Sequence, residues 1–115
     1  MAAAVLAATV SAACATLRAP EAPAVTPAGV RFVLRHPQAQ KVSLAGSFNQ
    51  WSESSHPLAR SSGVWTIVVA LPPGEYAFMY VVDGREWLTP PAARDYVDDG
   101  FGSRNGVVVV RSTDR

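Results

Sequence analysis

The fold is decided by residues 63–84, which have the sequence GVWTIVVALPPGEYAFMYVVDG. From Gly63 to Leu71 the side chains alternate between two faces, and Trp65 shares its face with the aliphatic residues at 67, 69 and 71. A period of two predicts a β-strand, because successive side chains of a strand point to opposite sides. Pro72-Pro73-Gly74 predicts a tight turn. Glu75 to Val82 then alternates in the same way, so two consecutive strands are expected.

Downstream of this stretch, Asp83-Gly84 predicts a hairpin, because glycine accepts the positive φ of a type I′ turn. Arg85 to Leu88 is expected to return as a short strand that ends before Pro90-Pro91. Asp95 to Asn105 is rich in Asp and Gly and is interpreted as a loop. Gly106 to Arg111 contains four consecutive valines, which is typical of a strand that is buried on both faces.

Upstream of it, two more strands are predicted. Val30 to Arg35 is rich in β-formers and ends at His36-Pro37, and Lys41 to Gly46 alternates polar and apolar residues. The chain therefore contains six or seven short strands at regular spacing, with no helical period after residue 18. This pattern predicts an all-β sandwich of the immunoglobulin-like type over residues 29–115, a length that is sufficient for one domain.

The first 28 residues differ in composition from the rest. Residues 1–17 are apolar or small, and residues 18–28 contain repeated prolines, which predicts an extended linker. The segment that ends at Cys14 resembles a bacterial lipoprotein signal, in which small residues precede a cysteine that becomes lipidated. We expect an exported protein, either secreted after cleavage or attached to a membrane through Cys14. The alternative is an Ala-rich tail with no targeting role on a cytoplasmic protein.

Composition excludes several classes of protein. The chain has 115 residues, of which 49% are hydrophobic and 17% are charged, so a packed core is expected rather than disorder. Ten basic and nine acidic residues give a net charge of +1, which argues against nucleic-acid binding. The single cysteine excludes a disulfide framework, and one cysteine with two histidines cannot build a structural zinc site. No catalytic constellation stands out, and neither a cofactor nor a metal ion is implied.

Six short segments occur together in a recognisable order. They are LAGSFNQW (44–51), PL (57–58), GVW (63–65), LPPGEY (71–76), YVVDG (80–84) and GFGSRN (100–105). In this order and spacing they resemble carbohydrate-binding module family 48, which includes the glycogen-binding domain of the AMP-activated kinase β subunit. The resemblance implies an early-set immunoglobulin-like sandwich that binds α-1,4-glucans and has no catalytic residues.

The resemblance also implies roles for particular residues. Trp51 and Trp87 match the two tryptophans that stack on sugar rings. Phe101 occupies the position of a leucine that inserts through the sugar ring, and Ser103 and Asn105 match the hydroxyl and amide contacts on the same loop. Each residue also has a structural alternative: Trp51 or Phe101 could cap the end of the core, and Asn105 could be a turn residue.

Two positions depart from the family pattern. Met79 stands where the family has a glucan-binding lysine, and a thioether cannot donate a hydrogen bond. Glu86 is one extra residue between the Asp83-Gly84 turn and Trp87, and one inserted residue moves side chains to the other face unless a bulge absorbs it. Two hypotheses therefore stay open: a glucan-binding module of weak affinity, or a structural or protein-interaction sandwich whose sugar site is degenerate. Trp65 and the tyrosines at 76 and 80 are expected in the core.

Overall fold

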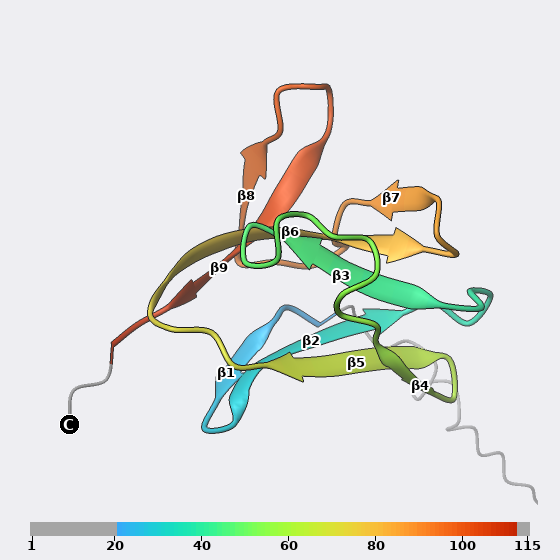
Figure 1. The fold of residues 1–115 in the computed structure, drawn as a ribbon, viewed down its shortest axis with the longest axis horizontal. Helices are drawn as coiled ribbons and strands as arrows, with labels where there is room; N and C mark the ends of the chain where they lie inside the picture. The colour runs from blue at the N-terminus through green and yellow to red at the C-terminus, as the bar shows by residue number, and fades with distance from the viewer. Residues whose placement is uncertain (1–20, 113–115) are drawn as a thin grey trace, which may run out of the picture.

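Two antiparallel sheets, with no helix, make up residues 21–112, the part of the chain that the computed structural model describes (Figure 1). The strands are β1 (Ala24–Thr26), β2 (Gly29–Arg35), β3 (Val42–Gly46), β4 (Ala59–Ser61), β5 (Val64–Val69), β6 (Gly74–Val82), β7 (Glu86–Leu88), β8 (Asp95–Asp98) and β9 (Arg104–Val110). The first sheet has the order β1-β2-β5-β4, and the second has the order β3-β6-β9-β8, with β7 added to β6. The prediction of an all-β sandwich is confirmed.

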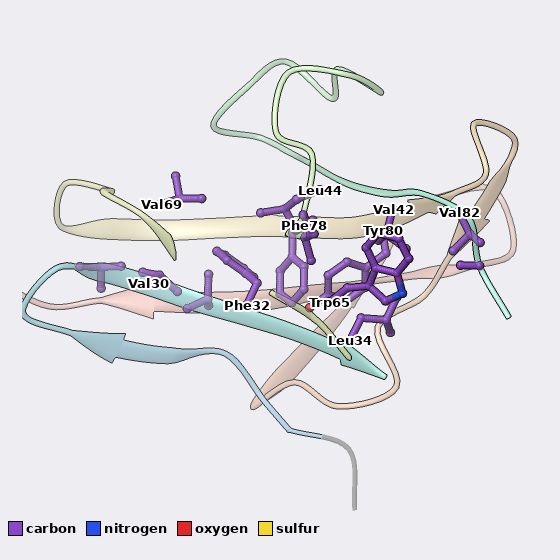
Figure 2. Close-up of a cluster of buried hydrophobic side chains, with 14 residues drawn as sticks. Val30, Phe32, Leu34, Val42, Leu44, Trp65, Val69, Phe78, Tyr80 and Val82 are labelled. Atoms are coloured by element: carbon purple, nitrogen blue, oxygen red, sulfur yellow. The ribbon is translucent and has the colours of Figure 1, made fainter. Parts of the chain in front are cut away.

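The core lies between the sheets and is built mainly from alternate residues of β2, β3, β5, β6 and β9 (Figure 2). Phe32 of β2 and Phe78 of β6 are fully buried, and their rings meet edge to face with centroids 5.0 Å apart. The Tyr80 ring packs against Phe78 in the same way, and its hydroxyl donates a hydrogen bond to the Val33 carbonyl at 3.2 Å. Burial raises the pKa of Tyr80 far above its usual range, so this hydroxyl stays a neutral donor.

The aromatic residues predicted for the core lie in it or at its rim. Trp65 is 4% exposed and its indole N–H donates to the His36 carbonyl at 3.0 Å, which satisfies a buried polar atom. Tyr76 is half-buried, packs against the rim of the core and donates its hydroxyl to the Pro72 carbonyl. The alternation of β5 and β6 therefore identified the core face correctly.

Three expectations are corrected by the structure. Residues 95–105 are not a loop throughout, because β8 pairs with β9 and only the tip between them is irregular. Ala24–Thr26, inside the predicted linker, pairs with β2 as a strand of the first sheet. The valine strand is not buried on both faces along its length, since Val109 is 44% exposed.

The predictions for the N-terminal segment lie outside the described residues. They concern the targeting signal of residues 1–17 and lipidation at Cys14, and they stay predictions. Between residues 21 and 112, no helix of the length and apolarity needed to span a bilayer is present.

Replacement of Phe32 tests the assignment of the core. Phe32→Ala is expected to lower the free energy of unfolding by about 3–5 kcal/mol, because it leaves a cavity against Phe78. The control is Val68→Ala on the exposed side of β5, which should change it by about 0.5 kcal/mol or less. Urea unfolding measures both, and equal midpoints for the two variants would contradict the assignment.

Candidate functional site

The second sheet has a face that points away from the core, and the register of its strands shows which residues it carries. On β6, Phe78, Tyr80 and Val82 belong to the core cluster, so Met79 and Val81 point to the opposite side. Residues that pair with these two share their side. We call this side the outer face; it comprises Ser43, Ala45, Ala77, Met79, Val81, Trp87, Asp95, Val97, Asn105, Val107 and Val109.

Trp87 reaches the outer face because the turn before it has three residues rather than two. Asp83 and Gly84 have φ values of 55° and 75°, as a type I′ turn requires, and the Arg85 N–H donates to the Val82 carbonyl at 3.1 Å. Val82 then pairs with Glu86, so Arg85 is left in the loop and absorbs the inserted residue. Trp87 consequently lies opposite Val81, on the outer face, and is 39% exposed.

The Asp83 carboxylate fixes this hairpin to the segment that leads into β3. One carboxylate oxygen accepts hydrogen bonds from the N–H groups of Gln40 and Lys41, at 2.7 and 3.1 Å. The Asp83 N–H in turn donates to the Lys41 carbonyl at 2.9 Å. These two backbone N–H donors lower the pKa of Asp83, because they stabilise the charged form of the carboxyl.

Trp51 lies in the loop that follows β3, and the Asn49 side chain organises that loop. Its amide oxygen accepts from the N–H groups of Gly46 and Ser52, at 3.0 and 3.2 Å. Its amide nitrogen donates to the Leu44 carbonyl at 3.0 Å and lies 2.9 Å from the His56 Nδ1. Asn49 thus uses its donor and acceptor atoms together to close the loop.

The backbone at Gln50 and Trp51 is left-handed, with φ values of 59° and 57°. This conformation is unusual for non-glycine residues and is costly for a bulky one. The Trp51 N–H donates to the Gly46 carbonyl at 2.9 Å, which holds the turn, and the Trp51 side chain is half-buried. Backbone strain of this kind persists only where the surrounding contacts fix the conformation.

Phe101 is at the tip of the hairpin formed by β8 and β9, which projects from the body of the sandwich (Figure 1). The Asp99 carboxylate accepts from the N–H groups of Phe101 and Ser103, at 2.7 and 3.1 Å, and so shapes the tip. Phe101 is 91% exposed, so the alternative that it caps the core is wrong. An aromatic ring this exposed on an ordered hairpin is available to a ligand.

Asn105 lies at the base of the same hairpin. It pairs with Val97 and precedes Gly106, which pairs with Phe78, so its half-buried side chain is on the outer face. Asn105 is a strand residue, so the alternative that it serves in a turn is wrong. Met79 is on this face as well but is only 6% exposed, and its thioether offers no donor.

The structure therefore brings together some of the predicted residues and separates others. Trp87 and Asn105 share the outer face, whereas Phe101 and Ser103 lie beyond it at the hairpin tip. Trp51 is in the loop that starts at the β3 end of the same sheet, where the Ser47 N–H donates to the Ala77 carbonyl at 2.9 Å. Between residues 21 and 112 no three His, Cys, Asp or Glu side chains are grouped to hold a metal ion.

Sequence reasoning missed two residues that position the site, Asn49 and Asp83. In the sequence, Asn49 stands out only as part of the LAGSFNQW segment, and Asp83 only as a turn residue. Each acts through its side chain on backbone groups. The partners of Asn49 are in its own loop and the end of β3, whereas those of Asp83 are more than 40 positions away in the chain.

An exposed tryptophan and an amide on one face of a β-sandwich, with an aromatic hairpin tip beyond it, are side chains of the kind that a small sugar-binding module uses. The chain belongs to the family described as the glycogen recognition site of AMP-activated protein kinase, whose model matches residues 29–115. The family is one of non-catalytic carbohydrate-binding modules.

Individual relatives are similar over the same region. The 1,4-alpha-glucan branching enzyme of Nitrosospira multiformis is 37% identical over 76 residues, which cover 60% of this chain and 10% of that enzyme. The AMP-activated protein kinase subunit beta-1 of Rattus norvegicus is 36% identical over 75 residues, which cover 65% of this chain and 26% of that subunit. The chain thus spans between a tenth and about a quarter of the length of these relatives.

The Asp83 contacts make stability depend on pH. Because the folded pKa of Asp83 is below the ordinary value of the carboxyl, 3.8, Asp83 contributes stability above that pH, and this is lost as the pH falls through the folded pKa. Asp83→Asn keeps a residue type that tolerates positive φ but removes the charge. The variant should be less stable than the wild type at pH 7, and the difference should shrink as the pH falls through the folded pKa of Asp83.

Urea unfolding at several pH values measures this effect. The matched control is Asp98→Asn, whose exposed carboxylate makes no hydrogen bond within the described part of the chain. A difference between wild type and Asp83→Asn that stays constant with pH would contradict the assignment.

Proposed function

We propose that the chain binds an α-1,4-glucan such as glycogen, starch or a maltodextrin on the outer face and performs no chemistry on it. The observation that carries this proposal is the position of Trp87, which the three-residue loop directs onto the outer face with 39% of its surface exposed. Membership of the glycogen recognition family supports it.

The chemistry of a glucan fits the residues that the site offers. A sugar ring has one apolar face of C–H groups and a rim of hydroxyls, so an aromatic plate covers the face and amide groups bind the rim. Trp87 and Trp51 supply the plates, and Asn105 supplies a donor and an acceptor. Phe101 adds an apolar contact at the hairpin tip, with Ser103 beside it as a hydroxyl partner.

Met79 limits the affinity that this site reaches. Its side chain is 6% exposed on the outer face and cannot donate to a sugar hydroxyl. The module therefore relies on stacking with few direct hydrogen bonds, and we propose that it binds weakly to single chain ends. Repeated chain ends on a branched polymer compensate for weak single contacts through a high local concentration.

A second candidate function is a protein-interaction sandwich with a degenerate sugar site. Met79 and the half-buried state of Trp51 favour it. The two candidates differ in whether Trp87 contributes to binding of a soluble glucan, which is directly measurable.

Substitution of the tryptophans tests the glucan site. Trp87→Ala and Trp51→Ala should each weaken binding of β-cyclodextrin and maltoheptaose by about tenfold or more, because each removes a stacking surface. Isothermal titration calorimetry is the appropriate measurement, since it does not depend on tryptophan fluorescence. Val68→Ala, on the exposed side of the first sheet, is the control and should bind like the wild type. No heat of binding by the folded wild type at millimolar sugar would exclude the glucan site.

Restoring a donor at position 79 tests the reason for weak binding. Met79→Lys should strengthen maltoheptaose binding by about fivefold, since one added hydrogen bond to a charged donor contributes on the order of 1 kcal/mol. Val107→Lys is the control, because Val107 is similarly buried on the outer face of the neighbouring strand. An equal gain in both variants would indicate a general effect of charge, and the specific role of position 79 would then be rejected.

A further inference from the structure

One side of the sandwich leaves two strand edges open. β1 is the edge strand of the first sheet, because it pairs only with β2. On the second sheet, β8 covers the free side of β9 only from Arg104 to Val107. Val108–Val110 therefore has β6 on one side and no strand on the other within residues 21–112. Unpaired N–H and C=O groups of this kind are a template for an added strand.

A groove of about 650 Å³ lies between these two edges. Its walls are Pro23–Val25 of the β1 edge and Val107–Val109 of β9, and both strands lie toward the same side of the molecule in Figure 1. Val25 is 57% exposed and Val109 is 44% exposed, so the groove presents apolar side chains to solvent. Apolar surface that is open to solvent beside a free strand edge is typical of an interaction site.

The charged residues of the groove have an excess of positive charge. Arg94 and Arg111 line it together with a single acid, Asp95. The salt bridge found in the described residues joins Arg31 to Glu21 and involves neither of these arginines. The groove is thus suited to a ligand that carries negative charge, because arginine binds carboxylates through paired N–H donors.

We propose that this groove binds an extended acidic segment of a partner protein as an added β-strand. The segment would pair its backbone with Val108–Val110, place alternate apolar side chains against Val25 on the core side of the edge, and direct a carboxylate toward Arg94 and Arg111. The free part of β9 has three residues, so a segment of about four residues, roughly 13 Å long, fills the edge.

The lining of the groove favours a peptide over a second glucan. Among residues 21–112 no aromatic side chain lines it, so this part of the chain gives it no stacking surface for a sugar ring. It offers instead a row of backbone groups and two cations, which match the regular backbone of a strand and its acidic side chains. The proposal does not depend on glucan binding, because Trp51, Trp87 and Phe101 are not part of the groove.

The test uses the full chain, labelled with ¹⁵N, and an acetylated and amidated hexapeptide of alternating valine and glutamate. The expected result is saturable movement of the amide signals of Ala24, Val25 and Val108–Val110, with a Kd on the order of 0.1–1 mM for so short a peptide. Two comparison peptides carry lysine in place of glutamate, or proline in place of the central valine. Both should bind at least about tenfold more weakly, through charge repulsion and loss of an N–H donor.

Variants of the protein separate charge recognition from general effects. Arg94→Glu and Arg111→Glu should each weaken binding of the acidic peptide by at least about tenfold. Arg35→Glu, which replaces an exposed arginine on β2, should leave this binding unchanged. All three variants should bind maltoheptaose like the wild type, so failure of this proposal is distinguishable from failure of the glucan site.

Several outcomes would overturn the proposal. They are no signal movement at about 5 mM peptide, equal binding of the glutamate and lysine peptides, or movement confined to Trp87, Asn105 and the hairpin tip. Movement of the groove signals on addition of maltoheptaose would identify a sugar as the occupant. Movement of the same signals with protein concentration, together with a dimer in analytical ultracentrifugation, would identify a second copy of the chain. Either of these last two results also rejects the proposal that a peptide occupies the groove.

Discussion

The alternation of side chains along β6 is the constraint on which the rest of this structure depends. Phe78, Tyr80 and Val82 point into the core, so Met79 and Val81 must form the floor of the outer face. β3, β7 and β9 all pair with β6, so their side chains are divided between the core and the outer face in the same way. A slip of one residue in any pair would exchange the faces of that strand and expose core side chains. The burial of the aromatic cluster thus determines where a binding residue on the second sheet can point.

Much of this arrangement could be predicted because it is local. The periods of β2, β3, β5 and β6 are visible in short windows, and so is the turn at Asp83-Gly84. β8 (Asp95–Asp98) was missed because it contains two aspartates and gains its strand conformation from pairing with β9, not from its own propensity. β1 was missed for a similar reason, since its flanking prolines favour an extended chain and only pairing with β2 makes it a strand.

The residues of the candidate site could be predicted from the sequence, but the hydrogen bonds and register that hold them in place could not. Trp51 and Trp87 were identified through a family resemblance, and the face on which Trp87 lies was open until the three-residue loop was seen. Whether an inserted residue is absorbed by a turn depends on the pairing of Val82 with Glu86, which no local pattern specifies. Asp83 acts on backbone groups that the fold brings to it from more than 40 positions away, so its role follows from tertiary structure, whereas Asn49 closes its own loop through local hydrogen bonds. Such contacts hold a binding surface in position before a ligand arrives, which reduces the entropy lost on binding.

β9 connects the two sites proposed here, and its length keeps them apart. Its first residues, Arg104 and Asn105, belong to the projecting hairpin and the outer face, whereas Val108–Val110 forms the free edge beside the groove. At about 3.3 Å per residue, Asn105 and Val110 are separated by roughly 17 Å, which exceeds the width of a single added strand or sugar ring. A peptide paired at one end of β9 would therefore leave the tryptophans accessible. One small sandwich could then attach a partner protein to a glucan without competition between the two ligands.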